Sequence, residues 1–354
     1  MAKRDIVVIG ASAGGVEALL SFVKALPPDL DAAIFIVVHL SPFSKSNLPR
    51  ILAKAGTLPA VHAINGQKIQ KGTIYVAAPG HHLILEKDNK IMVRKGPKEN
   101  RFRPSIDALF RSAALIYGPR VIGIVMSGLL DDGTSGMWNI KRNGGLALVQ
   151  DLEEALFPNM VRNVMQYVNV DHILAARDFG GLLTMLAKET APKRPNLTEE
   201  EMDLLKMEVT IATRENAFEV GILGMGKLVT FSCPECKGSL ISFDEGEMIR
   251  FRCQSGHAYS TSTLLASITT QIEEKLWEAM QGMEATDLLL RQIADHYKAS
   301  GQPAIAKQFK KKADDIAKRA RVLHDSVFTQ ELMSEDIRLA QDKPGRSVNV
   351  RRRK

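Results

Sequence analysis

The sequence has 354 residues, 45% of them hydrophobic and 25% charged, which is the composition of a folded protein of two or three domains and excludes a wholly disordered chain. Its three Cys residues are too few for a secreted disulfide scaffold, and no apolar run is long enough for a membrane-spanning helix. The first residues lead directly into a strand-like run with no secretory leader, so we expect a cytoplasmic protein.

The net charge of +7 is a local property of the C-terminal end. Residues 301–354 contain 14 Lys and Arg against 7 Asp and Glu, whereas the preceding 300 residues contain 33 of each sign. Enzymes that act on nucleic acid usually spread positive charge over their working face. We therefore expect no nucleic-acid partner, and we predict a basic, disordered tail over residues 336–354.

Residues 5–187 alternate short apolar, β-branched runs with amphipathic stretches. Strand-like runs lie at residues 5–9, 33–38, 73–77, 121–126, 146–150 and 172–175, and helical stretches lie at residues 15–26, 104–117, 136–142, 158–167 and 179–188. Continuous apolar runs of this kind suit strands that are buried on both faces. The pattern predicts an α/β domain over residues 1–190, with a doubly wound, mainly parallel sheet of Rossmann-like topology.

The composition changes after residue 190. Pro and charged residues at 192–196 indicate the start of a linker, and we assign a linker and helix to residues 191–227. Residues 228–262 hold every Cys of the chain and predict a small zinc-ribbon-like module. From Leu265 onward apolar residues recur every three or four positions, with a break at residues 301–303, which predicts a helical hairpin over residues 263–335.

The turn after the first strand, Gly10-Ala11-Ser12-Ala13-Gly14-Gly15, has three interpretations. A dinucleotide-binding loop would need an acidic residue at the end of the second strand, where His39 stands instead. The segment also matches the G-x-S-x-G pattern of a nucleophile elbow, in which a tight turn exposes the Ser12 hydroxyl. In the third interpretation, Ser12 only caps the following helix.

Because Ser12 and His39 follow consecutive strands, a sheet with parallel strands would place both at one edge, which favours a nucleophile and its base. The run at residues 121–126 leads to Asp131 and Asp132, either of which could be a helix cap, a metal ligand or the acid of a triad. The chain order Ser, His, Asp differs from the order in α/β-hydrolases and disfavours a conventional lipase.

Residues 5–187 resemble the catalytic domain of the chemotaxis protein-glutamate methylesterase family. The resemblance lies in the stretches VIGASAGGVEAL, IVVHLSP, IYVAAPGHHLIL, NRFRPSIDALFRSAA, VMSGLLDDGTSGM and VQDLEEALFPNM. It implies that Ser12 is the nucleophile, His39 the base and Asp132, rather than Asp131, the acid. It also implies that the backbone N–H groups of Ala13 and Leu129 stabilise the oxyanion, although this family often has Met-Gly where this chain has Leu129-Leu130.

The activity implied by this resemblance is hydrolysis of glutamate γ-methyl esters on chemoreceptor-like proteins through an acyl-enzyme, with glutamine deamidation as a related activity and no catalytic cofactor. The best-known members carry an inhibitory receiver domain before the esterase domain. This sequence starts at the esterase strand, so we expect a regulator acting in trans. The alternative is a non-catalytic scaffold or signalling adaptor that works through its C-terminal region.

Cys233-x₂-Cys236 is followed, after sixteen residues, by Cys253-x₃-His257. Two such knuckles around a hairpin provide the four ligands of tetrahedral zinc, and four protein ligands leave no open position for catalysis. We therefore predict a structural zinc site. The alternative, a redox C-x-x-C motif, lacks the βαβ context of thioredoxin-like proteins.

Overall fold

The computed structural model describes residues 2–39, 46–214 and 220–335. The chain divides into two units, Met1–Leu264 and Leu265–Lys354, which we describe separately. The basic tail expected over residues 336–354 lies outside the described residues.

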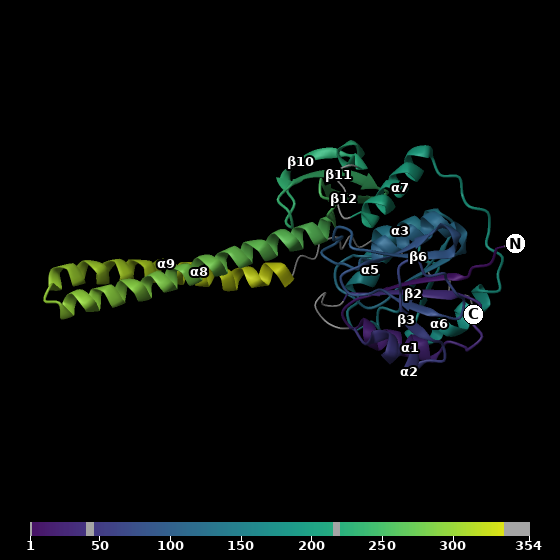
Figure 1. The fold of residues 1–354 in the computed structure, drawn as a ribbon, viewed down its shortest axis with the longest axis horizontal. Helices are drawn as coiled ribbons and strands as arrows, with labels where there is room; N and C mark the ends of the chain where they lie inside the picture. The colour runs from purple at the N-terminus through teal and green to yellow at the C-terminus, as the bar shows by residue number, and fades with distance from the viewer. Residues whose placement is uncertain (1, 40–45, 215–219, 336–354) are drawn as a thin grey trace. The chain divides into compact units, whose positions relative to one another are not determined.

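The first unit is built on a seven-stranded sheet of order β3-β4-β2-β1-β7-β8-β9, in which every neighbouring pair is parallel (Figure 1). Its strands are β1 (Ile6–Ala11), β2 (Ala33–Val38), β3 (Ala60–His62), β4 (Ile74–Val76), β7 (Val121–Val125), β8 (Leu146–Gln150) and β9 (His172–Leu174). The strand order reverses at β1, as it does in doubly wound folds. The predicted α/β fold is confirmed.

Both faces of this sheet are covered by helices, so alternate residues such as Val7 and Val8 belong to separate apolar cores. One face carries α1 (Gly15–Lys24), α2 (Leu48–Ala55) and α6 (Phe179–Leu186), and the other carries α3 (Ile106–Tyr117), α4 (Thr134–Arg142) and α5 (Asn159–Tyr167). Burial on both faces explains why the strands are continuously apolar in the sequence. Helix α2 and strand β3 are short, and the periodicity did not predict them.

Two smaller sheets belong to the same unit. Strands β5 (His82–Glu86) and β6 (Lys90–Arg94) form a hairpin. After α7 (Glu199–Thr213), strands β10 (Lys227–Ser232), β11 (Ser239–Glu245), β12 (Met248–Cys253) and β13 (Ala258–Ser260) form an antiparallel sheet in chain order. We call β10–β13 the cysteine module, because it contains every Cys of the chain.

The cysteine module meets the large sheet domain through a buried charge cluster. Arg252 of β12 contacts Glu208 of α7 at 2.7 Å and Glu99 at 3.3 Å, and Arg111 of α3 pairs with the same two glutamates. The other members are Asp107, Glu245 and Arg250, and all seven are at most 4% exposed. Charges buried this deeply are stable only when paired, so the cluster ties the module to the domain.

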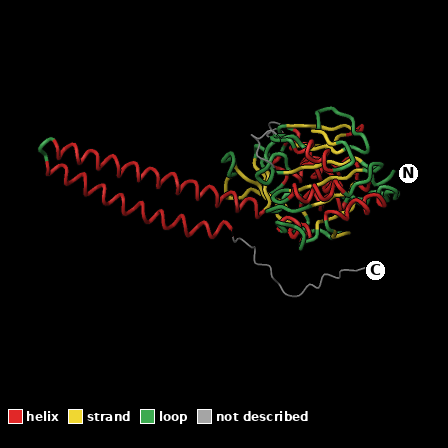
Figure 2. Tube along the Cα trace, turned by 90° about the horizontal axis from the view of Figure 1, so that it is seen from below, coloured by secondary structure: helices red, strands yellow, loops and turns green. Residues whose placement is uncertain are grey.

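The second unit is a helical hairpin (Figure 2), as the sequence predicted. Helix α8 (Thr261–Ala299) begins in the first unit, and α9 (Pro303–Glu335) runs back along it. Gly301 in the connection has a φ of 76°, which favours glycine. Arg291 of α8 contacts Asp314 of α9 at 3.1 Å, and Tyr297 stacks on Phe309.

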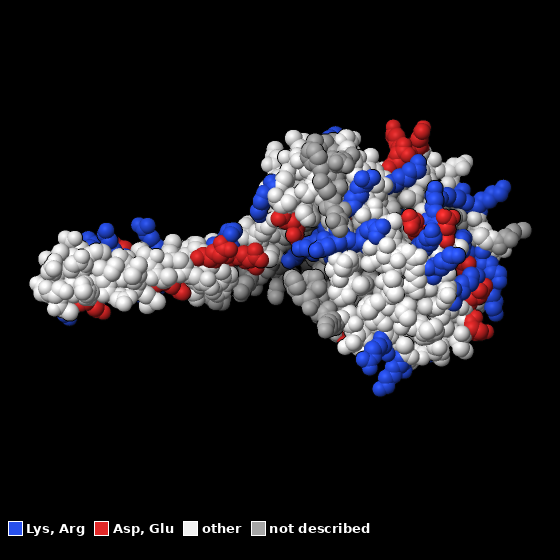
Figure 3. Space-filling model, viewed as in Figure 1, with Lys and Arg blue, Asp and Glu red and all other residues white. Residues whose placement is uncertain are grey.

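No helix in the described ranges is long and apolar enough to cross a membrane. On the face of the first unit shown in Figure 3, acidic and basic side chains are interspersed. Lys141 and Asp171 form a partly exposed ion pair, at 2.5 Å.

Candidate active site

The candidate site lies where three neighbouring parallel strands end. Strand β1 lies between β2 and β7, with Ala11 paired to Val38 and Gly10 paired to Val125. Ser12 follows β1 directly, His39 follows β2 directly, and the loop after β7 carries Asp132. Because the strands are parallel and in register, their carboxyl ends meet at one edge of the sheet.

The side chains at this edge form a continuous chain of hydrogen bonds. The Ser12 Oγ lies 3.2 Å from Nδ1 of His39, and Nε2 of His39 lies 2.8 Å from Oδ2 of Asp132. Phe102 stacks on the imidazole, with ring centroids 3.7 Å apart and an angle of 6° between the planes. The side chains of His39 and Asp132 are 2% and 1% exposed, while Ser12 is only partly buried. The imidazole and the carboxylate are thus almost fully buried.

The carboxylate of Asp132 is held at the N-terminus of α3. Its oxygens accept hydrogen bonds from the backbone N–H of Ile106 (2.7 Å) and Asp107 (3.2 Å), and from the side chains of Asn100 and Ser105 (2.9 Å each). A helix N-terminus and four donors favour the charged form. Burial acts to raise the pKa of Asp132, but the hydrogen bond and charge of His39, with the donors of Asn100 and Ile106, hold it well below its usual range.

Asp131 has different partners. Its two oxygens accept hydrogen bonds from the hydroxyls of Ser260 and Ser262, at 2.7 Å each, at the point where β13 passes into α8. Asp132 is therefore the carboxylate that the structure places against His39, and Asp131 links the loop after β7 to the cysteine module.

The turn around Ser12 is tightly packed. Gly14 has a φ of 69°, and a Cβ on Gly128 would lie 2.9 Å from the Cβ of Ser12. The Ser12 N–H donates to the carbonyl of Ser127 at 2.9 Å, which ties the turn to the loop after β7. Within the described residues, the N–H groups of Ala13 and Leu129 donate no hydrogen bond to the protein.

Comparison with known proteins matches this architecture to one family. A family model described as CheB methylesterase matches residues 7–183. The chain belongs to the CheB methylesterase family. The seven-stranded sheet and the Ser12 edge lie within this CheB domain, and membership confirms the expected class of carboxylic ester hydrolase.

A relative from Leptospira interrogans, provisionally named protein-glutamate methylesterase/protein-glutamine glutaminase, is 35% identical over 190 residues, which cover 54% of this chain and 98% of that protein. A protein-glutamate methylesterase/protein-glutamine glutaminase 2 from Anaeromyxobacter dehalogenans is 34% identical, covering 53% of this chain and 54% of that protein. The crystal structure of the Thermotoga maritima CheB methylesterase catalytic domain has a TM-score of 0.50 and 30% identity, covering 52% of this chain and all of that one.

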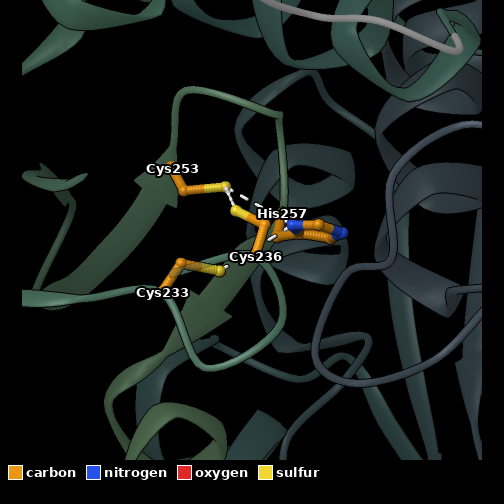
Figure 4. Close-up of side chains that lie close together, drawn as sticks. All are labelled: Cys233, Cys236, Cys253 and His257. Carbon is orange, nitrogen blue, oxygen red and sulfur yellow. Dashed lines mark hydrogen bonds between the residues drawn. The ribbon is translucent and has the colours of Figure 1, made fainter. Parts of the chain in front are cut away.

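The cysteine module brings its four predicted ligands together (Figure 4). The ligand atoms of Cys233, Cys236, Cys253 and His257 all lie within 4.8 Å of one another. The Sγ atoms of Cys236 and Cys253 are 3.6 Å apart, and Nδ1 of His257 is 3.4 Å from Cys253 Sγ. A tetrahedron with metal–sulfur bonds of about 2.3 Å has edges of roughly 3.7 Å, so the spacing fits a metal site.

Crowding of these thiols disturbs their ionisation. The hydrogen bond with Cys253 is the largest effect that lowers the pKa of Cys233, and the same bond raises the pKa of Cys253. Three neighbouring thiolates repel one another unless a cation shares their charge.

Sequence reasoning missed several residues that support the site. Phe102, which stacks on His39, and Ser105, which binds Asp132, lie in the stretch NRFRPSIDALFRSAA, where the residue types alone indicate no role for them. The same stretch begins with Asn100. The sequence indicates the buried charge cluster only through the alternation of Arg250 and Arg252 in β12. Alternating charged residues normally indicate a strand face that is exposed to solvent.

Proposed function

We propose that this protein is a protein-glutamate methylesterase that hydrolyses glutamate γ-methyl esters on a chemoreceptor-like protein. The observation that carries the proposal is the unbroken contact chain from Ser12 through His39 to Asp132, at the strand edge of a CheB domain. The names of the relatives support the substrate class.

In the proposed mechanism, the Ser12 hydroxyl donates its proton to Nδ1 of His39 while Oγ attacks the ester carbonyl. Nε2–H of His39 donates to Asp132, which fixes the tautomer and stabilises the imidazolium that forms. The N–H groups of Ala13 and Leu129 would bind the oxyanion. The imidazolium then protonates the leaving methoxide, methanol departs, and a water activated by His39 hydrolyses the acyl-enzyme to glutamate.

The same steps convert a glutamine side chain to glutamate when ammonia is the leaving group. This activity is the second part of the relatives' names, and we propose it as a side activity.

The test is methanol release from a methyl-esterified chemoreceptor fragment. Removing the nucleophile should lower the rate at least about 1000-fold in Ser12→Ala, because the alanine side chain cannot form the acyl-enzyme. Ser21→Ala is a matched control, because Ser21 is an exposed serine of α1 that lies outside the Ser12 turn. Equal rates in wild type and Ser12→Ala would refute the covalent route.

We also propose that Cys233, Cys236, Cys253 and His257 bind one structural zinc ion. The donor set and its spacing fit tetrahedral zinc, and both knuckles are closed by backbone hydrogen bonds, such as Lys237 N–H to the Cys233 carbonyl at 2.9 Å. Zinc would hold the two knuckles together and would take no part in ester hydrolysis.

The remaining expectations stay proposals. We propose a methylated chemoreceptor-like protein as partner, a cytoplasmic location, and a regulator acting in trans. We also propose that domain boundaries lie after residues 190, 227, 262 and 335.

A further inference from the structure

Asn100 occupies an unusual position between the cysteine module and the triad. It is fully buried in the loop before α3, and it adopts a left-handed backbone conformation with a φ of 49°. Its Nδ2 donates to two carboxylates, Oδ1 of Asp132 at 2.9 Å and Oδ2 of Asp107 at 2.8 Å. Asn100 is thus hydrogen-bonded directly to Asp132, the carboxylate that contacts His39.

The other side of Asn100 is held by the residues that follow His257. Its backbone N–H donates to the carbonyl of Ala258 at 2.8 Å. Its Oδ1 accepts from the backbone N–H of Ser260 at 3.1 Å and from the hydroxyl of Thr263 at 3.2 Å. Both donors belong to the end of β13 and the first turn of α8.

These four side-chain contacts fix which way the amide points. Its oxygen faces two donors from residues 260–263, so its NH₂ group must face the two carboxylates. The reversed amide would place its oxygen against Asp107 and Asp132, and it would turn its NH₂ group toward the Ser260 N–H, which would keep only the Thr263 hydroxyl as an acceptor. Reversal is therefore strongly disfavoured.

We propose that Asn100 is a positioning residue for the proposed catalytic acid Asp132, and that residues 258–263 of the C-terminal extension set its orientation. This inference rests on the proposed esterase mechanism. The extension is then part of the catalytic apparatus rather than an appended binding module, although it contacts neither Ser12 nor His39 in the described structure.

Residues 258–263 also contact the loop after β7 at Asp131, because the hydroxyls of Ser260 and Ser262 donate hydrogen bonds to its carboxylate. Residues 260–263 therefore bind Asp131 directly, and they contact Asp132 through Asn100. Loss of these contacts would weaken one of the four donors that hold the Asp132 carboxylate toward His39.

The first experiment compares methanol release by four variants of the full chain. Asn100→Ala should lower kcat roughly 10- to 100-fold with little change in KM, the effect expected on losing one hydrogen bond to a charged group. Thr263→Val should lower kcat several-fold, while Thr263→Ser, which keeps the hydroxyl, should restore it. Thr261→Val is the control, since Thr261 is exposed and its hydroxyl faces only the Ile249 carbonyl.

The second measurement needs no substrate. Carboxyl ¹³C NMR of aspartate-labelled protein, with the Asp132 signal assigned from Asp132→Asn, follows the titration of that group. Loss of the Asn100 donor should move the Asp132 midpoint to higher pH. A purely structural role would lower the amount of folded enzyme without moving this midpoint.

The outcomes separate the two proposals. Methanol release by wild type with unchanged kcat and pH profile in Asn100→Ala and Thr263→Val overturns the positioning role and leaves the esterase intact. If Asn100→Ala does not fold, the Thr263→Val and Thr263→Ser pair decides the question. If wild type releases no methanol, the esterase proposal fails, and an unchanged Asp132 titration in the variants would overturn the positioning role as well.

Discussion

The strongest stability prediction concerns Arg252, whose guanidinium is fully buried between the cysteine module and the CheB domain. It contacts Glu208 through two nitrogens, at 2.7 and 2.8 Å, and also reaches Glu99 and the Gly256 carbonyl. Arg252→Met removes one positive charge from a cluster of three arginines and four acids. Breaking a buried pair in this way leaves an uncompensated charge and costs about 3–5 kcal/mol.

The assay is urea unfolding followed by the fluorescence of Trp138, in a Trp277→Phe background so that the hairpin gives no signal. Trp138 lies against the β11–β12 turn, where a Cβ on Gly246 would come within 2.8 Å of its Nε1, so it reports on the contact with the cysteine module. With an m-value of about 3 kcal/mol per M, Arg252→Met should lower the midpoint by roughly 1–1.7 M.

Two controls make this prediction specific. Lys98 and Glu235 form a partly exposed pair between the same two parts, at 2.9 Å, so Lys98→Met should cost no more than about 1 kcal/mol. The double variant Arg252→Met/Glu208→Gln restores the net charge of the cluster and should recover part of the loss. A midpoint for Arg252→Met equal to that of Lys98→Met, or a double variant less stable than the single one, would refute the reasoning.

Two further predictions concern the same unit. Burial acts to raise the pKa of Glu99, but Arg111, Arg252 and Arg250 lower it to about 2, so its stabilisation is present above pH 4.5 and is lost as pH falls from about 4.5 to 2. The loss should be about 3 kcal/mol by urea titration between these values, and a Glu99→Gln curve just as steep would contradict it. Purified protein should contain about one zinc per chain by elemental analysis, and Cys253→Ser should lose it while Ser239→Ala, an exposed serine on the same sheet, keeps it. Full zinc occupancy in Cys253→Ser would remove Cys253 from the ligand set.

The placement of Ser12 and His39 was predictable because it depends on backbone topology alone. Each follows a short apolar run directly, and parallel neighbouring strands bring their ends together whatever the intervening sequence. The choice between Asp131 and Asp132 was not predictable from the residues, because it depends on which carboxylate meets the N-terminus of α3, about 25 residues earlier in the chain. Only the family resemblance indicated Asp132.

The role of Asn100 and the charge cluster could not have been found by local patterns. Glu99 and Arg252 are 153 positions apart, and Asn100 is 160 positions from Ser260. Helical and strand periodicity report which face of an element is buried, and charged residues on a strand normally indicate a solvated face. The cysteine motif was readable because its ligand spacing is short and chemically specific.

The buried charge cluster also bears on how this protein can be shortened. A chain cut after the CheB domain would keep Glu99, Asp107 and Arg111 but would lose Glu208, Arg250 and Arg252. The surface that is now buried would become exposed to water, and its two acids would outnumber its one arginine. Fragments for laboratory work should therefore end after Leu264 rather than near residue 190.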